Sequence, residues 1–297
     1  MIYYVLLAVS VILCVTKSSV YNAYAKTVKP TLFSTFIFNG ATYTVSALVA
    51  FITLFFSGFT LSLSTVICAF SYAVIVFSLQ TISVTAMKLG TMTLTTIFVM
   101  YGMLIPSLAG PLFWNEPFGI LQGVGIVLMA ASLWLLKDGN IEGEKSGAIS
   151  KKWLILGAVA FFLSGMAGVM EKIHQSTPGK EEKGMFVFVA CLFMLLFAFI
   201  ASAVTAKSKA QAEGSVKAKT LFSFGAISGA VIGLYCMINL TLAGNLDSMI
   251  YFPVANGGAM ILSVLVSSTV FKERLNKRKL IGVIVGVLGI VCLSIPI

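Results

Sequence analysis

The chain has 297 residues, of which 59% are hydrophobic and only 10% are charged, and its mean hydropathy is +1.02. A water-soluble protein is about 25% charged, so this composition excludes a soluble globular domain and indicates a polytopic membrane protein. The net charge of +10 does not indicate a nucleic-acid-binding protein, because the basic residues lie between apolar runs and do not gather with aromatic residues on one element.

Ten apolar runs are close to the roughly 20 residues that cross a bilayer, and backbone amides in hydrocarbon must be paired within a helix. The sequence therefore predicts an all-α polytopic membrane protein with ten transmembrane helices, at residues 2–25, 31–57, 62–83, 88–113, 118–136, 153–174, 184–206, 220–244, 248–271 and 279–296. Helix breakers agree with these limits. Pro30 opens the second helix, and Asn115-Glu116-Pro117 supplies a cap and a first-turn proline for the fifth.

An internal repeat organises the chain. Residues 70–128 recur at 227–285 without a gap, with eleven identical positions, and Glu116 aligns with Glu273 while Gly125 aligns with Gly282. Five helices per copy is an odd number, so the second copy is expected to enter the membrane inverted. We expect an N-terminal five-helix repeat at 1–136, a cytoplasmic linker at 137–152 and a C-terminal inverted repeat at 153–297.

The distribution of lysine and arginine predicts the orientation. The loops after the first, third, fifth, seventh and ninth helices carry sixteen of the twenty basic residues, which favours a cytoplasmic location for these loops. Both termini are then expected outside, in an integral protein of a bacterial cell membrane. A cleaved signal peptide is the alternative for the first run, because Ala23-Tyr24-Ala25 resembles a cleavage site, but no positive region precedes that run.

Lys17 is an ionisable residue inside the first predicted helix, where a charge is costly unless it is paired or hydrated. It belongs to a polar stripe with helical spacing, formed by Tyr3, Ser10, Cys14, Lys17, Tyr21 and Tyr24. Such a stripe is expected to face a cavity. Two interpretations remain open: Lys17 contacts a carboxylate or phosphate of a transported substrate, or its side chain extends to the cytoplasmic interface.

Further polar residues lie at interior positions of other predicted helices. The candidates for a substrate pathway, besides Lys17 and Tyr21, are Asn39, Tyr43, Tyr72, Gln80, Tyr101, Glu171, Tyr235, Asn239 and Asn256. Each of them could instead form a hydrogen bond between helices. Glu171 could also form a salt bridge across the loop to Lys172 or its neighbours, or simply end the sixth predicted helix.

Two glutamates and two glycines are expected to be structural. Inversion would place Glu116 and Glu273 on opposite membrane faces, about 30 Å apart, so they cannot form an acid/base pair. Each precedes a predicted helix, whose N-terminal dipole stabilises a carboxylate. Gly125 and Gly282 follow them by nine residues, and small residues of this kind permit close helix packing.

These features resemble the drug/metabolite transporter superfamily, in particular its ten-helix EamA-like members. The ninth predicted helix, with Tyr251-Phe252-Pro253-Val254-Ala255-Asn256-Gly257-Gly258, is also similar to the third helix of small multidrug resistance proteins. The resemblance implies two inverted five-helix repeats and transport of small molecules. The first helix lacks the carboxylate of the small multidrug pumps, which argues against a proton-coupled pump for cationic drugs. The family is described with cytoplasmic termini, whereas the charge distribution here predicts the opposite.

The sequence therefore predicts a secondary transporter that moves a small metabolite by alternating access. Amino acids and related zwitterions suit Lys17 and the polar candidates, export of lipophilic drugs is the alternative, and a membrane scaffold or regulatory protein is the non-transport alternative. We expect no enzyme activity, no cofactor, no metal site and no nucleic-acid partner, since clustered ligands and nucleotide-binding motifs are missing from the sequence. The expected partners are the small-molecule substrate, membrane lipid and a second copy of the chain, paired through residues 118–136 and 279–296.

Overall fold

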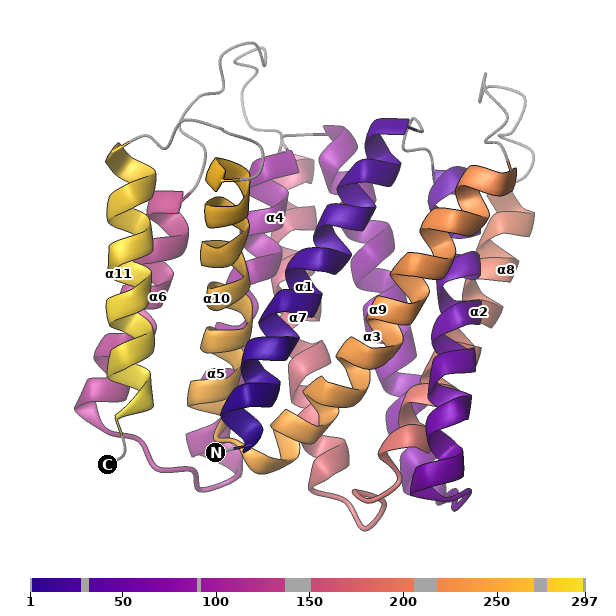
Figure 1. Cartoon of the computed structure of the whole chain (residues 1–297), viewed down its shortest axis with the longest axis horizontal. Helices are drawn as coiled ribbons and strands as arrows, with labels where there is room; N and C mark the ends of the chain where they lie inside the picture. Colours follow the sequence, from indigo (N-terminus) through magenta and orange to yellow (C-terminus); the bar gives the residue numbers. More distant parts are fainter. Residues whose placement is uncertain are drawn as a thin grey trace. The chain divides into compact units, whose positions relative to one another are not determined.

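The computed structural model describes residues 2–27, 32–89, 92–136, 151–205, 218–269 and 277–295. The regular structure in these ranges is α-helical, in agreement with the predicted fold class (Figure 1). The helices are α1 (Ile2–Thr27), α2 (Leu32–Ser57), α3 (Leu63–Leu89), α4 (Met92–Tyr101), α5 (Leu104–Phe113), α6 (Ile120–Leu136), α7 (Lys151–Gln175), α8 (Lys183–Thr205), α9 (Ala218–Asn245), α10 (Ser248–Thr269) and α11 (Lys277–Ser294).

Six helices of the described part are long and apolar enough to cross a membrane. They contain the spans Ile2–Tyr21, Leu32–Phe55, Leu63–Ala86, Lys151–Gln175, Lys183–Thr205 and Thr220–Asn245. The shorter stretches Phe98–Phe113, Ile120–Ser132 and Leu280–Leu293 are also apolar. Length and composition together therefore identify a helical membrane protein.

The fourth predicted helix, 88–113, is wrong as a single element, because the structure divides it into α4 and α5. Pro106 has no N–H to donate to the carbonyl of Gly102, so the i→i−4 pattern is interrupted there. The turn is closed by shorter i→i−3 bonds, including Ile105 N–H to Gly102 O at 3.1 Å and Met103 N–H to Met100 O at 3.2 Å. A proline four residues after a glycine thus ends α4 within an apolar run.

The start of α6 also differs from the prediction. Pro117 precedes the helix and does not occupy its first turn, because α6 begins at Ile120. The first backbone N–H groups of a helix have no partner within the helix. At the start of α6, the N–H of Gly119 donates to Oε1 of Gln122 at 2.8 Å. Asn115, which was expected to cap this helix, has a left-handed backbone with φ of 51°.

The described helices form two compact units. Unit 1 comprises Met1–Val15, Ile82–Val169 and Asn245–Ile297, and unit 2 comprises Thr16–Thr81 and Met170–Gly244. Each unit therefore takes residues from both predicted repeats. The predicted linker at 137–152 lies outside the described residues up to position 150, and Glu273 also lies outside them.

Unit 1 is organised around the contact of α6 with α11, which lie side by side in Figure 1. Gly125 of α6 allows this contact, since a Cβ there would lie 3.1 Å from the carbonyl oxygen of Gly289. Ser132 of α6 adds a hydrogen bond from its hydroxyl to the carbonyl of Gly282 at 2.8 Å. α10 packs against both of these helices and against α5.

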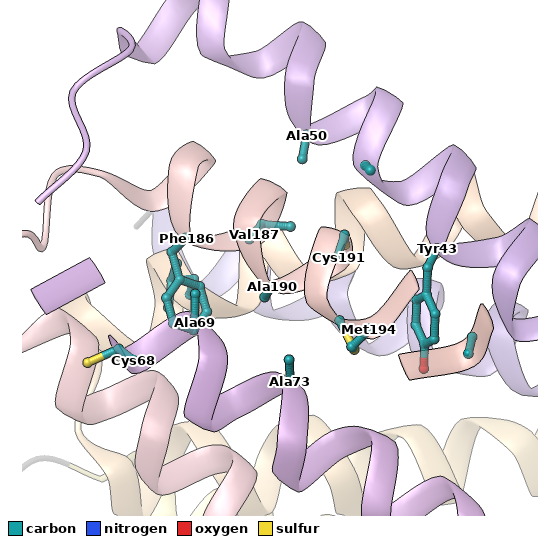
Figure 2. Close-up of a cluster of buried hydrophobic side chains, with 13 residues drawn as sticks. Tyr43, Ala50, Cys68, Ala69, Ala73, Phe186, Val187, Ala190, Cys191 and Met194 are labelled. Atoms are coloured by element: carbon teal, nitrogen blue, oxygen red, sulfur yellow. The ribbon is translucent and has the colours of Figure 1, made fainter. Parts of the chain in front are cut away.

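Unit 2 has α8 between α2 and α3. Figure 2 shows Phe186, Val187, Ala190, Cys191 and Met194 of α8 placed between residues of these two helices. The buried positions facing α8 include the small side chains Ala50 of α2 and Ala69 and Ala73 of α3. Small residues on the neighbouring helices let the backbones approach, which favours tight packing where lipid supplies no hydrophobic driving force.

Gly225, Gly229 and Gly233 of α9 lie against α2 in the same unit, as their four-residue spacing predicts. The first two show how close the helices are. A Cβ at Gly225 would lie 2.8 Å from that of Ala41, and one at Gly229 would lie 2.5 Å from the carbonyl oxygen of Thr42. Neither position can accept a larger residue without separating the helices. Ser46 of α2 joins the same contact by donating its hydroxyl to the carbonyl of Gly229 at 2.9 Å.

Candidate functional site

The candidate site lies inside unit 2 and contains a buried carboxylate. Glu171 is one turn from the end of α7 and is only 9% exposed. The hydroxyl of Tyr72 on α3 donates to its Oε1 at 3.2 Å. A carboxylate inside a membrane helix bundle requires such partners, because isolated charges are strongly disfavoured in an apolar medium.

Glu171 and Tyr72 border a small cavity between helices of unit 2. Its lining consists of Tyr72, Glu171, Phe186, Val187, Ala190, Cys191, Met194, Cys236 and Leu240. The cavity offers about 10 Å³ to the centre of a water molecule. This is close to the space that a single water requires. In this state the cavity is therefore too small for a metabolite.

Lys17 reaches the same region from α1. It is half-buried, and its Nζ lies 4.4 Å from the centroid of the Tyr235 ring on α9. This distance is within the range of a cation–π interaction, which is strongest for desolvated pairs. Cys236, which follows Tyr235, lines the same cavity as Glu171.

A second polar group in unit 2 joins α2 to α3. The hydroxyl of Tyr43 donates to Oε1 of Gln80 at 2.7 Å, and Nε2 of Gln80 donates to Oδ1 of Asn39 at 2.9 Å. Asn39 is 2% exposed, and its Nδ2 has no hydrogen-bond partner in the described part of the chain. Tyr21 of α1 borders this group through an edge-on contact with Phe38 at 6.1 Å between ring centroids.

Most of the predicted pathway residues thus belong to unit 2. They are Lys17, Tyr21, Asn39, Tyr43, Tyr72, Gln80, Glu171, Tyr235 and Asn239, the last of which is 4% exposed. Tyr101 and Asn256 belong to unit 1 and bond to the backbone: the Tyr101 hydroxyl donates to the carbonyl of Ala130 at 2.6 Å, and Nδ2 of Asn256 donates to that of Phe252 at 3.0 Å. The Tyr101 contact joins α4 to α6 and the Asn256 contact lies within α10, so the unit 2 residues are the stronger candidates.

Glu116 caps a helix, although not the one that follows it in the chain. Its Oε2 accepts the backbone N–H of Ser248 at 2.6 Å and its Oε1 accepts the Ser248 hydroxyl at 3.1 Å, at the first turn of α10. A Cβ at Gly110 would collide with this carboxylate and would lie 2.9 Å from Cβ of Ser248. The glycine therefore makes room for the cap.

An equivalent cap in unit 2 was missed by the sequence reasoning. Oε2 of Glu182 accepts the backbone N–H of Ser62 at 2.9 Å and the Ser62 hydroxyl at 2.8 Å, at the start of α3. Burial alone raises the pKa of the Glu182 carboxyl, but hydrogen bonds from Thr65 and Ser62 outweigh it and hold that pKa below its ordinary value. The serine immediately before an apolar run was the available signal for an N-cap.

His174 completes this second network. It is fully buried, its Nε2 lies 3.2 Å from the Thr65 hydroxyl, and its Nδ1 lies 3.0 Å from Nε2 of Gln175. Among the described residues, no three His, Cys, Asp or Glu side chains are grouped so that they could hold a metal ion. His174 therefore acts here as a hydrogen-bonding residue that joins α7 to α3.

Comparisons with known proteins identify a solved structure with a similar fold but no family. No family model matches the sequence, and no curated protein matches it. Among solved structures, a chain titled "Crystal structure of protein" is similar, with a TM-score of 0.74 over 98% of this chain and 96% of that chain, at 14% sequence identity. A similarity at this identity concerns the fold alone, and it extends over almost the whole of both chains.

Proposed function

We propose that this protein is a secondary transporter that moves a small metabolite across the membrane by alternating access, and that amino acids or related zwitterions are its cargo class. The observation that carries the proposal is the presence of two ionisable residues inside one apolar helical unit: Glu171 lines a small cavity, and the Lys17 ammonium lies over the ring of Tyr235. Ionisable residues within membrane helices commonly mark the path of a substrate or ion, because any other use of a buried charge is disfavoured.

The same proposal includes ten membrane spans in two inverted repeats and membership of the drug/metabolite transporter superfamily. Helix pairs that are equivalent under the repeat pack together: α2 with α8, α5 with α10 and α6 with α11. This pairing supports a duplicated architecture. The homodimer through α6 and α11 is retained as part of the proposal, supported by exposed apolar residues such as Val127 and Ile284 on these helices.

Flux into liposomes tests the transport function. The purified chain is reconstituted, the vesicles are loaded with a labelled metabolite pool, and exchange with external metabolites is followed. Only a carrier equilibrates its cargo, so a membrane scaffold would give no protein-dependent flux, and a drug exporter would move lipophilic dyes and not zwitterions. Lys17→Ala should abolish exchange, while Lys180→Ala, at an exposed lysine, should leave it unchanged.

The orientation is tested by labelling. Single cysteines in a cysteine-free background are placed at Gly139 and Lys180 and exposed to an impermeant thiol reagent in intact cells. The exposed position 180 is suitable, whereas a side chain at the neighbouring Gly179 would collide with Thr65. We expect reaction at 180 and protection at 139; the reverse pattern would place the termini in the cytoplasm.

A further inference from the structure

The Lys17 ammonium occupies a position whose chemistry suits any primary ammonium. Its Nζ lies over the Tyr235 ring at 4.4 Å from the centroid. A ring face attracts cations through its quadrupole, and the attraction increases when water is excluded. Lysine is a compact charge on a flexible four-carbon stem, so its ammonium can leave this ring without a change of the backbone.

An opposite charge lies in the same region. The buried Glu171 carboxylate lines the same small cavity as Cys236, the residue that follows Tyr235. Tyr72, whose hydroxyl donates to Glu171, lines this cavity as well. The site thus combines an aromatic face and a carboxylate, which together recognise organic ammonium groups.

We propose, on the basis of the proposed transport function, that Lys17 is a built-in substitute for the cargo: a primary ammonium of the cargo displaces the Lys17 ammonium from the Tyr235–Glu171 position, and Lys17 then pairs with the cargo carboxylate. The cavity lined by Glu171 and Cys236 supports displacement, because it has room for about one water and a cargo group cannot enter it unless a protein group moves. Charge balance supports it too, since a zwitterion adds one charge of each sign and leaves the net charge of the site unchanged.

The position can be tested by direct binding with three probes of similar size. L-alanine carries both charged groups, propylamine carries the ammonium alone, and propionate carries the carboxylate alone. Their dissociation constants are measured by calorimetry on the purified full chain in lipid nanodiscs. For the natural sequence, alanine should bind most tightly, because each single-charge probe leaves one protein charge without its partner.

Two sets of variants separate the roles of the residues. Lys17→Met should tighten propylamine binding by about tenfold, since the competing ammonium is removed, and should weaken alanine binding. Lys17→Gln is the second variant if Lys17→Met does not fold. In the Lys17→Met background, Tyr235→Phe should preserve propylamine binding because the ring face remains, whereas Tyr235→Leu should weaken it by about tenfold.

The outcomes distinguish this inference from the transport proposal. If propylamine gains nothing in the Lys17 variants, if Phe and Leu at position 235 behave alike, or if none of the probes binds, the ammonium position is disproved even when the liposomes exchange metabolites. If the probes follow the expected order but no protein-dependent flux occurs, the binding position stands and the transport function is disproved.

Discussion

The turn between α5 and α6 in unit 1 and the turn between α7 and α8 in unit 2 both cap the start of another helix, and both use the same residue types. In each, a glutamate accepts the backbone N–H and the hydroxyl of a serine at a helix start, Glu116 with Ser248 and Glu182 with Ser62. In each, the backbone N–H of the glutamate donates to the carbonyl of a glycine, at 3.4 Å to Gly110 and at 2.9 Å to Gly179.

The two turns differ in what surrounds the carboxylate. At Gly110 a Cβ would meet the carboxylate itself, whereas at Gly179 it would meet first the hydroxyls of Thr65 and Ser62. The unit 2 turn is also linked to the buried His174 through Thr65. The comparison indicates that Glu116 and Glu182 cap the starts of helices, in contrast to Glu171, which accepts a hydrogen bond from a tyrosine beside a cavity.

The largest effect is expected for Gly110→Ala. The added methyl displaces the Glu116 carboxylate, so the variant both overpacks the turn and loses the cap of α10, which together destabilise the protein by about 3 kcal/mol. The free energy of unfolding in mixed micelles measures it. Gly40→Ala is the matched control, because no atom lies within 4 Å of a Cβ there, and it should be neutral or stabilising by about 0.5 kcal/mol.

Gly179→Ala should have a smaller effect, of about 2 kcal/mol, because the hydroxyls that it meets belong to side chains that can rotate at the loss of their hydrogen bonds. The same unfolding measurement applies. An effect equal to or larger than that of Gly110→Ala would contradict the distinction between the two turns.

Removing either serine hydroxyl is expected to have a smaller effect, of similar size in the two turns. Ser62→Ala and Ser248→Ala each remove one hydrogen bond to a glutamate but leave the backbone N–H in place, so each should destabilise by about 1 kcal/mol. Combined with the glutamate variants in double-mutant cycles, each pair should be coupled. Additive effects of Ser248→Ala and Glu116→Gln would show that this contact is energetically unimportant.

The smallest effect is expected when the charge alone is removed. Glu182→Gln keeps an acceptor oxygen and should lose about 0.5 kcal/mol near neutral pH. Because folding lowers the pKa of Glu182, its stabilising contribution is complete above the ordinary glutamate pKa and is lost as the pH falls through the lower folded value. Unfolding measured from neutral to acidic pH should therefore show a smaller loss of stability in the variant than in the natural protein.

The helical frame could be predicted from the sequence, because long apolar runs in a membrane protein allow few alternatives. The break between α4 and α5 could have been predicted as well, since Pro106 lies within the run and its effect is local. The Glu182 cap could not, because Glu182 stands among lysines in a charged loop, and only the tertiary fold brings it to Ser62, 120 positions away.

The candidate site could also be predicted only in part from the sequence. The polar spacing around Lys17 predicts an inward-facing stripe, and Glu171 is among the predicted pathway residues. Their surroundings could not be predicted: Tyr235 lies over Lys17 and Tyr72 bonds to Glu171 because α9 and α3 pack there. Contacts between distant helices leave no periodic signal in one sequence, so the partners of a buried charge have to come from the fold.

The hydrogen bonds of the Tyr43–Gln80–Asn39 group can run in either of two directions. In the structure each donor faces the same way, from the Tyr43 hydroxyl toward Asn39, so the buried end offers an N–H. If both amide groups turn over, Asn39 donates to Gln80, Gln80 donates to the Tyr43 oxygen, and the buried end offers a carbonyl oxygen. Two amide rotations thus convert this end from a donor to an acceptor without any change in charge.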